Sequence, residues 1–232
     1  MKMKIISINH KNKGKPHFID INAYHHTIYP HDSLDQYYAP IYKLCQTKIV
    51  NDQLYTIAIN DGIRSLDENI STIHQRRFKH RKRLYPDVTK SIDTSIYLSD
   101  RPHLYKLEFW SPFRSDSLEY YKTHIEPLAS YDRLDKSKKK WHCDKLEVKL
   151  HELLWSNLDY MMQSVLETAP PSEYYINIQP DIYSQTTKHM HGQKGTTYPE
   201  VFNLYFTSNL YIPTLLSIGQ AISIGYGTII EV

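Results

Sequence analysis

The order of hydrophobic patterns in the first part of the chain constrains its fold most strongly. Met3–Ile8 is short, β-branched and roughly alternating, which predicts a strand, and Ile19–Tyr29 predicts a short helix. Ile41–Val50 and Leu54–Ile59 predict a hairpin, because the Asn-Asp-Gln stretch between them suits a turn. Apolar residues then recur at helical spacing over Ile63–Ile73, which predicts an amphipathic helix. The resulting order, β-α-β-β-α, is the opening of a ferredoxin-like fold.

The rest of the chain repeats this order. Ser91–Leu98 predicts a strand that closes the first sheet, and Asp100-Arg-Pro102 marks a joint. Beyond the joint, the expected strands are Leu104–Trp110, Glu173–Gln179, Val201–Phe206 and Thr228–Val232, and the expected helices are Ser115–Leu128 and Leu146–Leu166. We therefore expect an α+β protein with two tandem ferredoxin-like (RRM-like) domains, the first over residues 1–99 and the second over residues 100–232.

The composition is that of an ordinary globular protein. Of the 232 residues, 41% are hydrophobic and 23% are charged. No apolar stretch approaches the length of a membrane span, and the N-terminus lacks the apolar segment of a signal peptide. The two cysteines, Cys45 and Cys143, are far apart in sequence and predict no disulfide framework. We expect a cytoplasmic protein that does not associate with a membrane.

Positive charge is concentrated in two short blocks, although the net charge of the chain is only +3. One block spans His74–Arg83, and the other lies within Lys136–Lys140. Such blocks on a nearly neutral protein predict a polyanionic partner, most often nucleic acid; the alternative is a solvated loop that binds nothing. Twenty tyrosines add flat faces on which exposed bases could stack. The basic side chains that we expect to contact RNA are Arg76, Arg77, Lys79, Arg81, Lys82, Arg83 and Lys194.

Three of the thirteen histidines cluster after the first predicted strand. His25, His26 and His31 precede Lys43 of the predicted hairpin. Imidazole titrates near neutral pH, so it can accept a proton from one oxygen and deliver a proton to another. RNA carries its own nucleophile, the ribose 2′-hydroxyl, so proton transfer alone can cut it, and a lysine can offset charge on the phosphate. These four residues are candidate catalytic groups; the alternative is a surface or capping role for each histidine.

Other catalytic patterns are weak. His189-x-His191 and the pair His142-Cys143 could supply metal ligands, but a structural zinc site needs two paired motifs at suitable spacing. The sequence has no serine elbow, no Walker A pattern and no Rossmann glycine triplet after a first strand. We expect neither a metal nor a cofactor.

Glycines gather near the C-terminus. Gly219, Gly225 and Gly227 lie within nine residues, directly before the β-branched run of the last predicted strand. Glycine permits positive φ angles and close backbone approach, so the cluster predicts a shaped loop whose amide groups face a ligand such as a phosphodiester. The alternative is a bulged hairpin without a ligand.

The same tail carries a recognisable signature. Its Phe206, Ser208-Asn209, Ile212-Pro213, Gly219, Gly225-Tyr-Gly227 and Thr228-Ile229 positions resemble the C-terminal signature of the CRISPR repeat-processing endoribonucleases of the RAMP superfamily. The stretches Tyr38-Ala-Pro40-Ile-Tyr42-Lys43 and Ile57-Ala-Ile59-Asn-Asp-Gly62 resemble the hairpin of that family. The similarity touches most of the chain, and the tail is its specific part.

The resemblance implies an endoribonuclease that cuts CRISPR precursor RNA within each repeat. Cleavage in this family is generally metal-independent and leaves a 5′-hydroxyl and a 2′,3′-cyclic phosphate. The family's general acid/base histidine commonly lies between the first strand and the hairpin, which corresponds to His25, His26 or His31, and we rank His26 and His31 ahead of His25. The implied partners are CRISPR repeat RNA and subunits of a CRISPR effector complex. The oligomeric state stays open, with a homodimer among the alternatives.

Two positions depart from the glycine-loop pattern of the family. That pattern often has a lysine after its second glycine and a basic residue before the Gly-aromatic-Gly element, where this chain has Gln220 and Ile224. The loss of two phosphate partners leaves other functions open. One is a non-catalytic RAMP subunit that binds crRNA in an effector complex. Another is an unrelated ferredoxin-like interaction domain whose glycine tail matches by chance.

Overall fold

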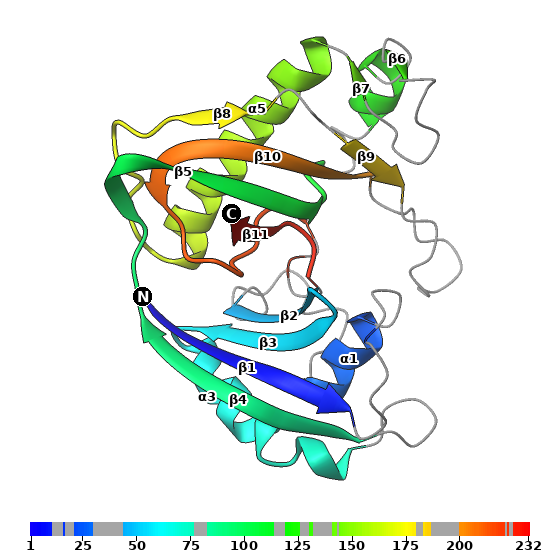
Figure 1. Ribbon diagram of the computed structural model, residues 1–232, viewed down its shortest axis with the longest axis vertical. Helices are drawn as coiled ribbons and strands as arrows, with labels where there is room; N and C mark the ends of the chain where they lie inside the picture. The colour runs from blue at the N-terminus through cyan, green and yellow to red at the C-terminus, as the bar shows by residue number, and fades with distance from the viewer. Residues whose placement is uncertain are drawn as a thin grey trace. The chain divides into compact units, whose positions relative to one another are not determined.

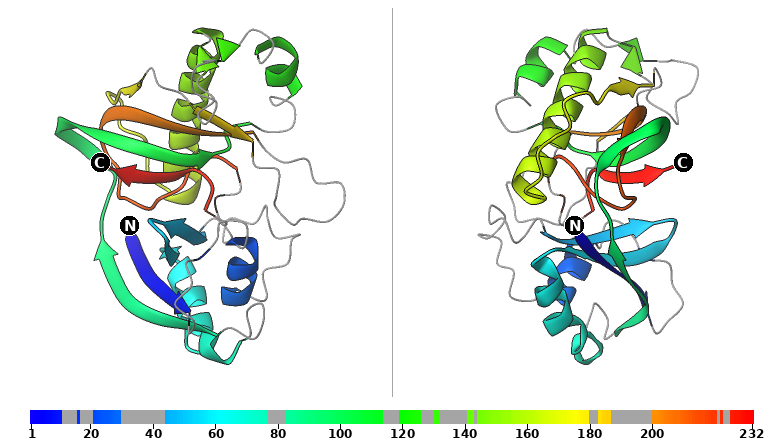
Figure 2. Two further views of the ribbon diagram at one scale, coloured as in Figure 1. Left: turned by 45° about the vertical axis from the view of Figure 1, so that its right-hand side comes forward. Right: turned by 90° about the vertical axis from the view of Figure 1, so that its left-hand side faces the viewer.

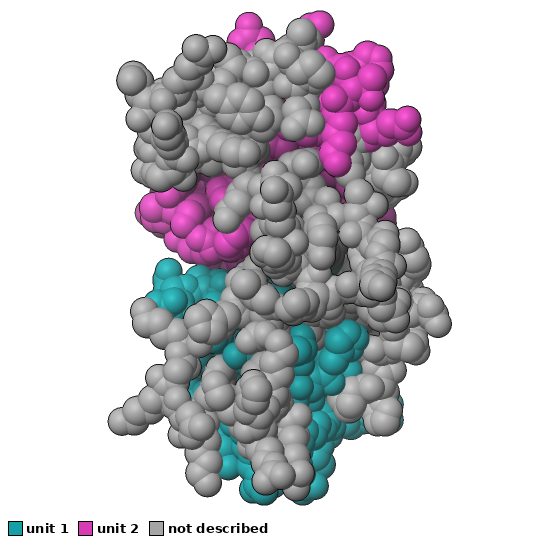
Figure 3. All heavy atoms as spheres, turned by 90° about the vertical axis from the view of Figure 1, so that its right-hand side faces the viewer, with its two compact units in different colours: residues 1–94, 222–225 teal, residues 95–221, 226–232 magenta. Residues whose placement is uncertain are grey.

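The chain forms two compact units. The structure, a computed structural model, describes residues 1–10, 16, 21–29, 44–76, 83–113, 119–125, 130–131, 141–142, 144–179, 183–186, 200–220, 222 and 225–232 (Figure 1). The first unit contains Met1–Thr94 and Ile222–Gly225, and the second contains Ser95–Ala221 and Tyr226–Val232 (Figure 3). A short segment near the C-terminus therefore belongs to the first unit, although the strand that follows it belongs to the second.

The first unit has the β-α-β-β-α-β order of a ferredoxin-like fold. Its elements are β1 (Lys2–His10), α1 (Ile21–Ile28), β2 (Cys45–Val50), β3 (Gln53–Ile59), α3 (Gly62–Ile70), the 3₁₀ turn η3 (Ile73–Gln75) and β4 (Leu84–Asp93). The four strands form an antiparallel sheet in the order β2-β3-β1-β4. The side chains of Ile6, Ile8, Leu54 and Ile57 in this sheet are at most 1% exposed. Burial of these apolar side chains supplies the main stabilisation of the unit.

The second unit repeats the strand order of the first. Its elements are β5 (Tyr97–Trp110), the π-helical turn η4 (Tyr121–Ile125), β6 (Ser130–Tyr131), β7 (Trp141–His142), α5 (Asp144–Tyr160), the π-helical turn η6 (Met161–Val165), β8 (Ile176–Ile178), β9 (Tyr183–Thr186), β10 (Glu200–Tyr211) and β11 (Thr228–Glu231). The main sheet has the order β11-β5-β10-β8, with β9 paired to β10, and β6 pairs with β7. The expected α+β class with two ferredoxin-like units is confirmed.

Helix α5 covers one face of the second sheet, as both views of Figure 2 show. Leu146, Leu150, Leu154 and Leu158 are 0% exposed and recur every four residues, so they form one buried face. The helix continues into η6, which agrees with the helix expected over Leu146–Leu166. Within the described residues, no helix is both long and apolar enough to cross a membrane.

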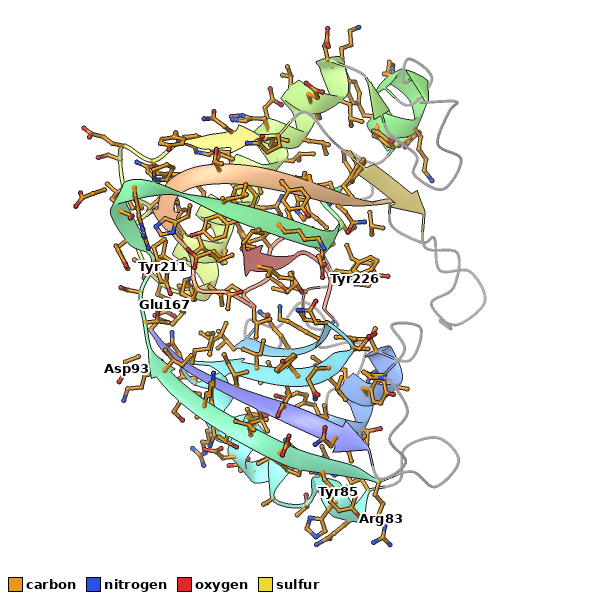
Figure 4. The ribbon with its side chains drawn as sticks, in the orientation of Figure 1. Arg83, Tyr85, Asp93, Glu167, Tyr211 and Tyr226 are labelled. Atoms are coloured by element: carbon orange, nitrogen blue, oxygen red, sulfur yellow. The ribbon has the colours of Figure 1, made fainter. Side chains whose placement is uncertain are left out.

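The prediction of a closing strand over Ser91–Leu98 is wrong. The closing strand of the first sheet is β4, which begins at Leu84 and ends at Asp93, a residue labelled in Figure 4. From Pro86 to Asp93 its residues are exposed, so this strand lacks the alternation that identifies a half-buried strand. The joint expected at Asp100-Arg-Pro102 lies inside β5, as does the expected domain boundary between residues 99 and 100.

Candidate histidine site in the first unit

Helix α1 carries two of the three candidate histidines, and its burial pattern separates them. Ile21, Tyr24, His25 and Ile28 are at most 2% exposed, and their spacing places them on one face of the helix. His26 follows by one residue, about 100° further around the helix axis. It is half-buried. The amphipathic pattern of α1 therefore assigns His25 to the core and His26 to its edge.

His25 connects α1 with strand β2. Its Nδ1 atom lies 2.9 Å from Thr47 Oγ1, and its ring centroid lies 5.0 Å from that of Tyr29. The Tyr29 hydroxyl in turn lies 2.9 Å from Thr56 Oγ1 on β3. Because His25 is 0% exposed, its imidazole holds the helix against the sheet and does not reach solvent in this conformation.

His26 lies beside this buried contact. Its ring centroid is 6.1 Å from that of His25, and the two ring planes meet at 71°, an edge-to-face arrangement. Part of the His26 side chain reaches the surface. Of the two candidate histidines on α1, His26 is therefore the one that a substrate can reach without movement of the helix.

Gly225 brings the C-terminal segment to the same place in the first unit. Its φ angle is +86°, and a Cβ atom at this position would lie 2.9 Å from the carbonyl oxygen of Thr47 and 3.3 Å from Lys48 Cα. Only glycine fits here, because a side chain would collide with the backbone of β2 and disfavour the positive φ. Gly225 thus packs against Thr47, the residue that holds His25.

Lys48, the next residue of β2, is a fully buried amine. It is 0% exposed, and desolvation lowers the pKa of its ammonium group well below the usual value. Sequence reasoning named Lys43 and missed both Lys48 and Thr47. The available signal was a lysine between threonine and isoleucine inside a predicted core hairpin, where a charged side chain is unusual.

The other two glycines of the tail are also required by the protein itself. Gly219 and Gly227 have φ angles of +95° and +65°. A Cβ atom would lie 2.7 Å from the carbonyl oxygen of Ser111 at the first position and 1.8 Å from that of Ile218 at the second. The amides of Gly225 and Gly227 donate to the carbonyl oxygens of Ile222 and Phe109. These two amides are therefore used inside the protein, and contact of the three glycines with RNA stays a prediction.

The basic block contains residues with different environments. Arg76 is half-buried and donates hydrogen bonds from both terminal nitrogens to four oxygen atoms of the first unit. Arg83 is exposed directly before β4, at the bottom of Figure 4. Only an exposed side chain such as Arg83 is ready to meet a phosphate without giving up protein contacts.

Several predicted site residues lie outside the described part of the chain. They are His31, Lys43, Arg77, Lys79, Arg81, Lys82 and Lys194. The structure therefore brings together His25 and His26, with Gly225 near them, and does not bear on the residues just named. Among the described residues, no three His, Cys, Asp or Glu side chains are grouped so that they could hold a metal ion.

Comparison with known proteins gives a consistent answer at the level of the fold. No protein-family model matches the sequence, and no curated protein matches it significantly. Solved structures do match. A structure of the CRISPR RNA processing endoribonuclease Cas6b superposes with a TM-score of 0.65 at 19% identity, covering 100% of both chains.

Two further solved structures agree over the same length. Another Cas6b structure matches with a TM-score of 0.61 at 18% identity. Csf5, a type IV Cas6 crRNA endonuclease, matches with a TM-score of 0.56 at 12% identity, and both comparisons cover 100% of each chain. Over its full length, the chain therefore has a fold similar to that of the solved Cas6b and Csf5 structures.

Proposed function

We propose that this protein is a metal-independent endoribonuclease that cuts CRISPR precursor RNA within its repeats. The observation that carries the proposal is the full-length likeness to Cas6b, a CRISPR RNA processing endoribonuclease, with a TM-score of 0.65. Structural similarity at 19% sequence identity supports the fold and does not by itself support the chemistry. The chemical part of the proposal rests on the imidazole groups of α1 and on general acid/base chemistry.

The proposed reaction needs proton transfers and no added nucleophile. A neutral imidazole takes the proton of the ribose 2′-hydroxyl, and the 2′-oxygen attacks the adjacent phosphorus. The bond from phosphorus to the 5′-oxygen breaks, and that oxygen receives a proton from a second acid. The products are a 5′-hydroxyl and a 2′,3′-cyclic phosphate, so atoms and charge balance without water.

Within the described site, His26 is the residue that we assign to proton transfer. It is half-buried, whereas the neighbouring His25 is 0% exposed and bonded to Thr47. His25 then acts as a positioning residue, since its contact with Thr47 fixes the helix that carries His26. His31 and Lys43 keep their proposed catalytic roles.

Cleavage of repeat RNA in the presence of EDTA tests this function. The substrate is a CRISPR repeat RNA. We expect a single cut with a 2′,3′-cyclic phosphate end, and a loss of rate of about 100-fold or more in the double variant His26→Ala/His31→Ala. The matched control is His124→Ala, because His124 is an exposed histidine outside the basic block. The two single variants then separate His26 from His31.

Other results would support different conclusions. Tight binding of the repeat RNA without any cut would support the non-catalytic crRNA-binding subunit. Cleavage that EDTA abolishes would contradict metal independence. Absence of RNA affinity at low salt would exclude both RNA functions.

A further inference from the structure

Arg76 makes a set of contacts that its place in the basic block does not suggest. Its Nη1 atom donates to the carbonyl oxygens of Thr27 (3.1 Å) and Ile28 (2.6 Å), at the C-terminus of α1. Its Nη2 atom donates to Asn69 Oδ1 and Thr72 Oγ1, both at 3.0 Å. One guanidinium group thus joins the end of α1 to the last turn of α3 and to Thr72, which follows it.

These contacts suit the end of a helix. The last carbonyl groups of an α-helix have no partner within the helix, and a positive charge at that end interacts favourably with the helix dipole. The planar guanidinium group can serve two sets of acceptors at once, which an ammonium group cannot do in the same geometry. Arg76 therefore satisfies backbone acceptors that would otherwise need water.

Such contacts add to the burial of Ile21, Tyr24 and Ile28 in holding α1, which is a short helix. Residues Ile21–Ile28 form about two turns, and isolated helices of this length are not stable in water. Described polar contacts hold it at two places. His25 bonds to Thr47 through its side chain, and Arg76 binds the carbonyl groups of Thr27 and Ile28.

We propose that Arg76 is a positioning residue of the proposed ribonuclease, which holds α1 so that His26 keeps its place beside His25, and that it is not a phosphate ligand. The inference rests on the proposed function for its consequence in catalysis. Its structural part, the support of α1 by Arg76, can be measured without RNA. Partial desolvation of the guanidinium lowers the pKa of Arg76, which agrees with a half-buried group.

The two roles of an arginine predict different kinetics. A phosphate ligand contributes to RNA affinity, and its loss lowers the dependence of binding on salt, because each phosphate contact releases counterions. A positioning residue acts through the geometry of the reacting groups, so its loss lowers kcat and leaves KM and the salt dependence unchanged.

The experiment compares Arg76→Ala and Arg76→Lys with the control Arg64→Ala. Arg64 lies on α3 of the same unit, is exposed and pairs only with Glu68 among the described residues. For Arg76→Ala we expect kcat for repeat RNA to fall about tenfold or more. We expect KM to stay within about twofold and the salt slope of RNA binding to stay unchanged. Arg76→Lys keeps the positive charge but loses the planar guanidinium group, so its kcat should lie between those of Arg76→Ala and the wild type. Arg64→Ala should behave like the wild type.

A measurement on the free protein keeps the inference independent of catalysis. In Arg76→Ala, we expect hydrogen exchange of the α1 amides to become about tenfold faster, with shifted imidazole resonances for His26; Arg64→Ala should change neither. If Arg76→Ala does not fold, Thr72→Val removes one acceptor and serves as the milder variant. Unchanged exchange in α1 would overturn the positioning role.

Loss of affinity with a salt slope lowered by about 0.7 and an unchanged kcat would show that Arg76 is a phosphate ligand. If the wild-type protein does not cut RNA but hydrogen exchange in α1 is faster in Arg76→Ala, the proposed function is wrong. The inference that Arg76 supports α1 then still holds.

Discussion

The buried amine of Lys48 should make the stability of the protein depend on pH. Lys48 lies on β2 with 0% exposure, and desolvation lowers its pKa well below the usual value of 10.5. In the unfolded chain the same amine titrates normally. Between the folded and the unfolded pKa, the unfolded state binds more protons than the folded state, so the free energy of unfolding rises with pH across this window.

Replacement of Lys48 by methionine should therefore stabilise the protein near neutral pH. Met has a similar length and no charge to desolvate. We expect the variant to have a higher free energy of unfolding than the wild type at about pH 7. In the wild type the free energy of unfolding should rise with pH by up to about 1.4 kcal/mol per pH unit, and this rise should be absent in the variant. Urea unfolding at about pH 7 and about pH 9.5 measures both effects.

The control for this prediction is Lys90→Met on β4, where the lysine is exposed. It should leave the pH dependence as in the wild type. Equal pH slopes for Lys48→Met and the wild type would mean that the buried amine stays protonated in the folded protein.

The connection from β10 to β11 is the element that most distinguishes the second unit. In the first unit, α3 joins the third and fourth strands of the βαββαβ order, whereas the described residues of Ile212–Gly227 contain no α-helix. Without a helix, the backbone N–H and C=O groups of this connection need hydrogen-bond partners elsewhere in the protein. Here Ile218 donates to Gly227 O, and Gln220 donates to Ser111 O.

Glycine at position 227 is required for this connection, so alanine there should destabilise the protein. Its φ is +65°, and a Cβ atom would lie 1.8 Å from the carbonyl oxygen of Ile218, a backbone atom that cannot move alone. We expect a loss of at least about 2 kcal/mol. The melting temperature should fall by roughly 4–8 °C in thermal unfolding.

Thr214→Ala is the matched control, because Thr214 is exposed in the same connection. It should change the free energy of unfolding by less than about 0.5 kcal/mol. A Gly227→Ala variant that melts with the wild type would show that the backbone adapts more easily than the contact with Ile218 suggests.

Elements with strong local signals were predicted well from the sequence. The hairpin β2-β3 turns at Asn51 and Asp52, whose positive φ angles of 49° and 61° are those that Asn and Asp tolerate best. Strand β4 was not predicted at its true bounds because it contains Pro86 near its start and Lys90 among its apolar positions, both unusual in a buried strand. Its place is set by backbone pairing with β1, a long-range interaction that leaves no local pattern.

At the scale of the whole molecule, positive charge is distributed unevenly along the chain. The block His74–Arg83 combines Arg76, which is bound within the protein, with Arg83, which is exposed. Position in a basic block therefore does not establish a contact with RNA. The block should be tested without Arg76.

Neutralisation of the remaining basic side chains should weaken RNA binding. The variant replaces Arg77, Lys79, Arg81, Lys82 and Arg83 by glutamine. We expect lower affinity and a flatter dependence of log K on log salt, by about 0.7 for each lost contact with single-stranded RNA. A salt titration of repeat-RNA binding measures the slope, with Lys2→Gln and Lys90→Gln as controls in the same unit. An unchanged slope would show that these basic side chains do not contact the RNA phosphates.

The sequence alone determined the fold class and the repeat of the ferredoxin-like order, because strand alternation, helical spacing and turn residues are local properties of the chain. It also determined that α1 carries adjacent histidines. Only the tertiary structure decided that His25 is buried against Thr47 while His26 remains partly exposed, and that Arg76 serves a helix end. Hydrogen-bond partners depend on which distant segments meet, and Thr47 and Arg76 are both far from their partners on α1 in the sequence.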